Sequence, residues 1–471
     1  MENNPHLPST IARLASTREA ATPPVAPSSI LARLLLWTEH VSNLTTAVAL
    51  ILCLLLSVGD ALGVEPAAPP DDPEALADLA VRAHPSLAAL TSRTEALKAA
   101  ASAARLWSDP MLGAELSNLP VTSPILGAHA MSGLQFKLQQ RFPGPGELKA
   151  RARTADLTVD VAERDYDAAA NDLRGEVRAR YYDLALLRQL EVVTRDHLAQ
   201  LDTLIAAVDA KYQVGVASQH DLLRLSLRRD RLAQTLLDFP ARQQQVLAVL
   251  NGALARDPSA PVRTPGVTRI TSLPTDPTHR RDAIANHPDI ARLDAQAALA
   301  SAEAEQARVE ANPEPTVWLG YRVRAEVPNA DPGINFVTAG VSLPLPFAST
   351  RRWRAMESAA NLRARAADEA ADGVRSRLTA RLAAAEAAFL RATELATAYR
   401  ESLEPAALAA LESTLSAYQV GRAEFADLVG AEVELLDIRG LALRAEADAA
   451  AARSTILTLL AEASPPAGDT E

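Results

Sequence analysis

Cysteine, aromatic residues and net positive charge are all scarce in this 471-residue sequence. The single cysteine, Cys53, excludes a disulfide framework and a metal site built from CxxC pairs. Aromatic residues make up only 4% of the chain, fewer than the core of a compact enzyme of this size would normally contain. The formal net charge of −11 argues against nucleic-acid binding, which usually requires a basic surface.

Long hydrophobic runs are also scarce, and the clearest is the stretch from Leu44 to Val58. Arg33 precedes this stretch and small residues follow it, as in a secretory signal peptide, and the run is too short to predict a membrane-spanning helix. Cys53 lies inside the run, and the leucines before it favour a core residue of the signal over a lipidated cysteine. We expect residues 1–63 to be a disordered N-terminus with a signal-like apolar segment.

Alanine supplies much of the 48% hydrophobic content. Alanine-rich sequence with leucine and charged residues at helical spacing favours long, closely packed helices. We find no nucleophile–base–acid set, no glycine-rich phosphate loop and no HExxH spacing. We therefore expect no enzyme activity, no cofactor, and no catalytic or metal-binding residues. His84 and His287 each precede a proline, and we expect them to close a helix turn rather than bind a metal.

Short stretches with a period of two interrupt the helical pattern. The alternation is clearest between residues 133 and 142, where apolar and polar side chains take turns: Leu134, Phe136 and Leu138 against Gln135, Lys137 and Gln139. Such alternation is typical of a half-exposed strand, so we expect a hairpin of two strands over 111–142. A second pair of strands is expected at 316–324 and 334–343, with Arg322 and Arg324 on its polar face.

Two copies of the motif YQVG divide long helical stretches. A helix of about 65 residues is expected from Glu147 to Tyr212, and a return helix from Ser218 to about Leu250. The glycine between them, Gly215, can adopt the positive φ that a tight turn requires. Gly421 occupies the same place between the helical stretches 350–417 and 423–462. Each motif is therefore interpreted as the tip of a helical hairpin.

The landmarks of the first half recur in the same order in the second half. Three dipeptides that end in proline recur at an offset of 203 positions, and the YQVG motif recurs at an offset of 206. The pairs are His84-Pro85 with His287-Pro288, Asp109-Pro110 with Asn312-Pro313, and Phe142-Pro143 with Leu345-Pro346. This order indicates an internal two-fold repeat. We predict a first repeat at 64–250, a linker at 251–276, a second repeat at 277–463 and a tail at 464–471.

One chain offers four strands, whereas a membrane barrel needs at least eight strands and no open edge. Three chains would supply twelve strands, with lipid against the apolar faces and water against Lys137 and Arg322. The predicted fold is therefore mainly α with a small β part: long helical hairpins form a trimeric α-barrel, and four strands per protomer contribute to a 12-stranded transmembrane β-barrel. Five aromatic residues near strand ends are expected to lie in interfacial belts: Trp107, Phe142, Trp318, Tyr321 and Phe347.

At about residues 73–462 the chain resembles the TolC family of bacterial outer-membrane efflux proteins. The resemblance rests on the duplicated HPxhxxL segments (h apolar) at His84 and His287, on FPGPGELKARA and LPLPFASTRRWRA after the strands, and on the two YQVGxAxxxDL tips. The stretches SDPMLGAELSNLP and QFKLQQRFPGPGELKAR look most like the heavy-metal branch, that is, CzcC- and CusC-like proteins.

The resemblance implies a homotrimeric channel-tunnel located in the outer membrane, with most of the chain in the periplasm. Its barrel would contact outer-membrane lipid, and its helical end would dock through a periplasmic adaptor (membrane fusion) protein to an inner-membrane efflux pump. Such a component of a tripartite, RND-type system is a passive export duct for heavy-metal ions or drugs. No nucleic acid is implied.

The resemblance also assigns roles to residues at the tips. The adaptor would contact Val214, Gly215, Val420 and Gly421, and Asp427 would lie at the pore constriction. A second acid, found three positions later in some members, is Gly430 here. Asp221 at the first tip has a simpler explanation, because acids at a helix start are favoured by the helix dipole.

The alternative is a secreted periplasmic coiled-coil structural or adaptor protein without a barrel. Such a protein would share the long helices. It would not explain strands with one apolar face or the duplicated hairpins.

Overall fold

The structure is a computed structural model that describes residues 72–266, 269–273, 276–327, 330–345 and 349–461. About 71% of the described residues are helical, and their β structure is a single four-stranded sheet. The mainly α architecture with a small β part is thus confirmed. The predicted signal-like segment, the tail and Phe347 lie outside the described residues. The predicted limits of the two repeats stay a prediction.

Each half of the chain begins with two short helices joined at a histidine. These are α2 (Pro73–Ala83) and α3 (Pro85–Ala103) in the first half, and α6 (Pro277–Ile284) and α7 (Pro288–Val309) in the second. His84 Nδ1 accepts a hydrogen bond from the Ser86 N–H, and His287 Nδ1 accepts one from the Asp289 N–H, each at 3.2 Å. Both histidines cap the helix that follows, as predicted.

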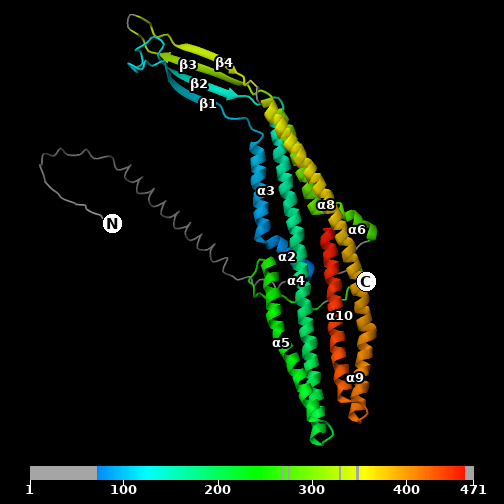
Figure 1. The fold of residues 1–471 in the computed structure, drawn as a ribbon. Coiled ribbons are helices and arrows are strands. Elements are labelled where there is room, and N and C mark those ends of the chain that lie inside the picture. Colours follow the sequence, from blue (N-terminus) through cyan, green and yellow to red (C-terminus); the bar gives the residue numbers. More distant parts are fainter. Residues whose placement is uncertain (1–71, 267–268, 274–275, 328–329, 346–348, 462–471) are drawn as a thin grey trace, which may run out of the picture. The chain divides into compact units, whose positions relative to one another are not determined.

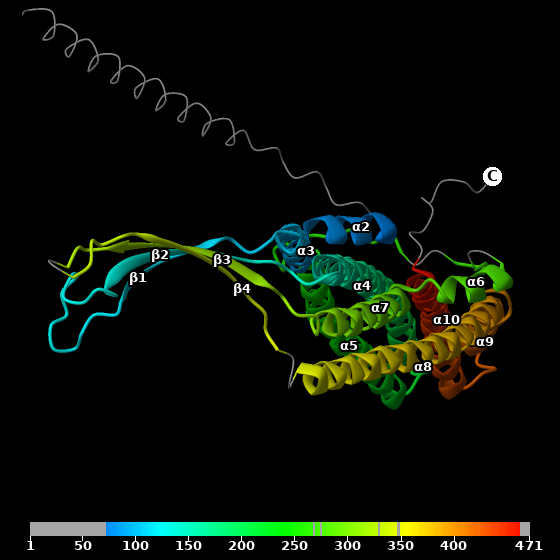
Figure 2. The same cartoon turned by 90° about the horizontal axis from the view of Figure 1, so that it is seen from above.

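The four strands form one antiparallel sheet in the order β1-β2-β3-β4. They span Met111–Ser117, Gly133–Arg141, Thr316–Arg324 and Phe336–Ser342. Strands β2 and β3 come from different halves of the chain and pair over nine residues each, so the two hairpins make a single surface. Figures 1 and 2 show the strands side by side, beyond the ends of the long helices.

The register places a row of apolar side chains from all four strands on one face, whereas Met111, Trp318 and Phe336 lie on the other. Leu138 lies opposite Leu112 on β1 and opposite Leu319 on β3, and Leu319 lies opposite Ala339 on β4. The neighbouring row on the other face holds Gly113, Lys137, Gly320 and Thr338. Leu112, Leu138 and Leu319 remain about half or more exposed, at 74%, 48% and 53%. The predicted alternation therefore produces a sheet with an uncovered apolar face.

The expected place of Trp318 in an interfacial belt on the lipid side is wrong. Trp318 has the strand parity of Lys137 and Arg322, so its ring lies on the polar face. The Lys137 ammonium lies 4.9 Å from the centroid of this ring, and a Cβ added to Gly340 would approach the ring to 2.5 Å. Position near a strand end suggested a belt residue, but alternation decides the face.

Two very long hairpins make up most of the chain. In the first, α4 (Glu147–Gln213) has 67 residues, about 100 Å of helix, and α5 (Gln219–Ala253) returns beside it. In the second, α8 (Ser349–Ala398) continues into α9 (Glu404–Gln419), and α10 (Phe425–Leu460) returns. Figure 1 shows both hairpins with their tips at the end away from the sheet. The order of helix, two strands, long helix and return helix thus occurs twice.

The expected uninterrupted helix over 350–417 contains a π-helical turn at Tyr399–Leu403. Pro405 follows at the start of α9; it lacks an N–H and its ring would clash with the carbonyl four residues earlier in an α-helix. A wider turn relieves that clash. Arg400 fixes the turn by pairing with Glu446 of α10 and with Glu404 of α9, at 2.8 and 3.0 Å.

The linker between the halves binds both long helices. Arg188 of α4 donates hydrogen bonds to the Val262 carbonyl and to Thr264 Oγ1, at 2.7 and 2.8 Å. Arg269, further along the linker, donates to Thr397 Oγ1 of α8 and to Glu401 Oε1 of the π-helical turn, both at 2.9 Å. The linker therefore fastens the two halves of the chain to each other.

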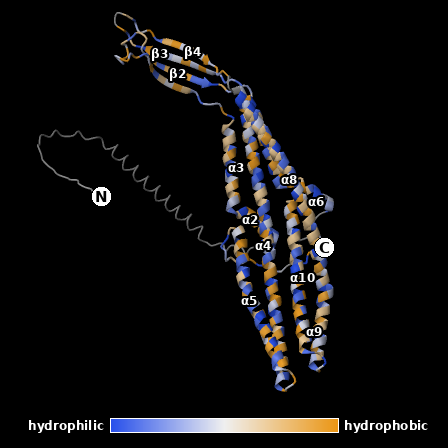
Figure 3. Cartoon of the chain, viewed as in Figure 1, coloured by the Kyte–Doolittle hydropathy of each residue, from blue (hydrophilic) through white to orange (hydrophobic). Residues whose placement is uncertain are grey.

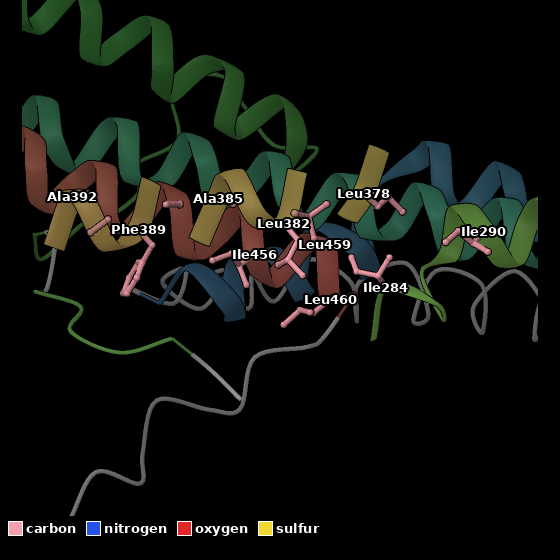
Figure 4. Close-up of a cluster of buried hydrophobic side chains, with 12 residues drawn as sticks. Ile284, Ile290, Leu378, Leu382, Ala385, Phe389, Ala392, Ile456, Leu459 and Leu460 are labelled. Carbon is pink, nitrogen blue, oxygen red and sulfur yellow. The ribbon is translucent and has the colours of Figure 1, made fainter. Parts of the chain in front are cut away.

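The helices pack through small clusters of aliphatic side chains with alanine at the closest contacts. Figure 4 shows the largest cluster, in which Ile284 and Ile290 meet residues of α8 and α10. Helices α4 and α10 approach so closely that a Cβ added to Gly175 would lie 2.9 Å from Thr458. Polar and apolar residues are mixed along every helix in Figure 3. Among the described helices, none combines the length and apolar character needed to cross a membrane.

Candidate functional site: the hairpin tips

Both tips end their helices with a glycine in the left-handed conformation. Gly215 has φ 75° and donates its N–H to the Tyr212 carbonyl at 2.9 Å. Gly421 has φ 73° and donates to the Tyr418 carbonyl at 3.1 Å. A Cβ on either glycine would meet no atom within 4 Å, so the backbone conformation, and not crowding, favours glycine here. The predicted role of both residues as turn formers is confirmed.

The return helices begin with matching carboxylate caps. Asp221 Oδ2 accepts a hydrogen bond from the Ser218 N–H at 3.3 Å, and Asp427 Oδ2 accepts one from the Glu424 N–H at 3.2 Å. Both acids occupy the third helical position, where a carboxylate satisfies a free backbone donor and complements the helix dipole. Asp427 remains exposed at the tip. It can therefore cap its helix and still face solvent.

Lys211 joins the two tips. Its ammonium donates to the carbonyls of Tyr418 and Gln419, at 2.5 and 3.1 Å, and lies 4.3 Å from the centroid of the Tyr418 ring. A cation at the C-terminal end of α9 is stabilised by the helix dipole. Burial raises the pKa of Tyr418, and the nearby Asp221 carboxylate raises it further. The lysine thus holds the second tip against the first.

Apolar side chains of α4 and α10 pack together next to the tips. Phe425 and Leu428 of α10 pack against Leu201, Leu204 and Val208 of α4. Tyr418 meets the Phe425 ring edge-on, with centroids 6.2 Å apart. Further from the tips, the buried side chains of His197 and Glu432 contact each other through Nε2 and Oε1. This pair joins α4 of the first half of the chain to α10 of the second half.

Valine side chains at the tips point into solvent. Val214 is 73% exposed and Val420 is 68% exposed, and Val216 beside the first tip is 69% exposed. Each tip therefore offers an exposed apolar side chain on a turn that backbone hydrogen bonds hold in place. The structure brings the four predicted contact residues to the two tips that Lys211 links.

Residues 280–462 match the sequence model of the family "Outer membrane efflux protein". Protein CyaE of Bordetella pertussis is similar as well, at 32% identity over 219 residues, which is 45% of this chain and 45% of CyaE. The chain thus matches less than half the length of this curated relative.

Solved structures of outer-membrane channels share the fold. The outer-membrane channel OprN aligns with a TM-score of 0.71 at 18% identity, over 83% of this chain and 90% of OprN. CusC aligns with a TM-score of 0.69 at 16% identity, over 82% of this chain and 91% of CusC. The two scores do not separate a heavy-metal branch from other channels.

The family match of residues 280–462 and the shared channel fold bear out the resemblance to the TolC family that the repeated motifs indicate. They also confirm the predicted location, the outer membrane with most of the chain in the periplasm. The sequence did not indicate Lys211 or the pair of His197 and Glu432, because the contacting residues are more than 200 positions apart along the chain.

Proposed function

We propose that three copies of the chain close into one channel through the outer membrane. The observation that carries this proposal is the sheet: it has an uncovered apolar face, and β1 and β4 are its edge strands among the described residues. Unpaired edge groups cannot be left in a bilayer, so β4 of one copy would pair with β1 of the next. Three sheets of four strands then form a closed barrel with lipid outside and water inside.

The long hairpins would form the periplasmic tube below this barrel, and the repeat within each chain would arise from duplication. The channel acts as a passive export duct, coupled through a periplasmic adaptor to an inner-membrane pump of the RND type that supplies the energy. Heavy-metal ions or drugs are the cargo classes that the family resemblance suggests. A periplasmic coiled-coil protein without a barrel would have the hairpins but no use for the sheet.

The tips would be the surface that the adaptor contacts, because Val214 and Val420 are exposed apolar residues on fixed turns. Changing both valines to aspartate should abolish capture of the adaptor from cells that express both proteins, and should lower export to the level of cells without the channel. Changing both to isoleucine keeps the apolar surface and should preserve capture. Equal capture by the aspartate and isoleucine variants would contradict a contact at these residues.

Asp427 would lie at the periplasmic constriction of the channel, since it is exposed beside the second tip. Cysteines introduced at Asp427 and joined across protomers by a bifunctional reagent should stop export, and reducing a cleavable reagent should restore it. A channel that still exports while its protomers are joined would show that this position does not gate the path.

A further inference from the structure

The polar face of the sheet carries more positive than negative side chains. Five charged strand residues share this face because the register and the alternation give them the same parity. They are Glu115, Lys137, Arg141, Arg322 and Arg324. The opposite, apolar face carries none of the charged residues of the four strands.

Carboxylates neutralise the outer members of this set but not the central ones. Arg141 pairs with Glu314, which lies just before β3 in the chain. Arg324 pairs with Asp331, which lies in the loop between β3 and β4. Lys137 and Arg322 form no ion pair with any residue that the structure describes. The two cations thus outnumber Glu115, the one acid on the polar face of the strands.

Neutral groups hold both central cations in place. The Lys137 ammonium lies over the Trp318 ring, which in turn packs on Gly340, where a Cβ would collide with it at 2.5 Å. Arg322 Nη2 donates a hydrogen bond to Gln135 Oε1 at 2.7 Å. These contacts orient the positive charges without cancelling them. Both side chains remain partly exposed on the polar face.

We propose that Lys137 and Arg322 form a cationic belt that faces the water inside the channel and favours anionic over cationic solutes. The proposal rests on the barrel put forward above. A narrow passage with low-dielectric walls focuses the field of such charges, and rings of basic side chains select anions in pores. The belt suits cargo that crosses the outer membrane as an anion and disfavours free metal cations.

The belt can be tested by the reactivity of a cysteine at Thr338, in a chain whose Cys53 is replaced by serine. Thr338 is exposed on the polar face, diagonally across from Arg322 and in the same row as Lys137. Its modification rate is measured in outer membranes with an anionic methanethiosulfonate, the sulfonatoethyl reagent, and with the cationic trimethylammonium-ethyl reagent. The ratio of the two rates reports the local potential.

The anionic reagent should react preferentially, and the ratio should fall on the order of fivefold in the variant K137Q/R322Q, since two charges within about 10 Å are removed. The variant R82Q/R93Q loses the same charge on helices α2 and α3 and should leave the ratio unchanged. A ratio that does not respond to K137Q/R322Q would overturn the belt.

A cysteine at Ala339, the next residue on the apolar face, separates this failure from failure of the barrel. It should resist both reagents in membranes, because lipid covers it. If Ala339→Cys reacted as fast as Thr338→Cys, the barrel itself would be wrong. If Thr338→Cys reacted with neither reagent, the polar face would not be lined by water, and both proposals would fall.

Discussion

Changing Leu319 to arginine is expected to remove the protein from the outer membrane, whereas changing Gln139 to arginine is expected to be tolerated. Leu319 lies in the middle of the apolar face, between Leu138 and Ala339, and is 53% exposed. An arginine on the lipid side of a barrel costs about 2–4 kcal/mol at the centre of the bilayer, and a trimer would carry three of them.

Gln139 is the matched control because it lies on β2, one residue from Leu138, on the opposite face. An added arginine there would face water beside Trp318. The measurement is the amount of each variant in the outer-membrane fraction of a density gradient, compared with the unchanged chain. Wild-type amounts of Leu319→Arg in that fraction would show that the apolar face does not contact lipid.

Changing His197 to leucine is expected to lower the free energy of unfolding by about 3–5 kcal/mol. His197 is fully buried and Glu432 is 2% exposed, so the substitution leaves a carboxylate inside the helical packing without its partner. Adding Glu432→Leu should recover most of the loss, because replacing a whole buried pair by apolar side chains is often close to neutral.

The control is His220→Leu, which removes an exposed histidine at the start of α5 and should change stability little. Unfolding of the purified protein in detergent can be followed by circular dichroism as denaturant is added. A His197→Leu variant as stable as His220→Leu would mean that the contact between α4 and α10 contributes nothing to holding the two hairpins together.

Local patterns in the sequence were enough to predict the elements of the fold. Alternation located the strands, glycine at Gly215 and Gly421 located the turns, and proline after His84 and His287 located the helix caps. Each of these features depends on residues that are neighbours in the chain. The alternation also predicts that Trp318 lies on the polar face, whereas its position near a strand end suggested a belt residue.

Contacts between distant segments could not be predicted in this way. Three such contacts join the two halves of the chain: the pairing of β2 with β3, the bond from Lys211 to the second tip, and the buried contact of His197 with Glu432. The π-helical turn before Pro405 was missed for another reason: a proline inside a long helix can be tolerated, as Pro240 is within α5. Only the surrounding packing decides which outcome occurs.

The number of chains in the particle tests the central claim most directly. One chain contributes four strands and two hairpins, which cannot close a barrel without further copies. Native mass spectrometry of the protein released from detergent should show three chains per particle. A particle with a single chain, or with two, would contradict the account.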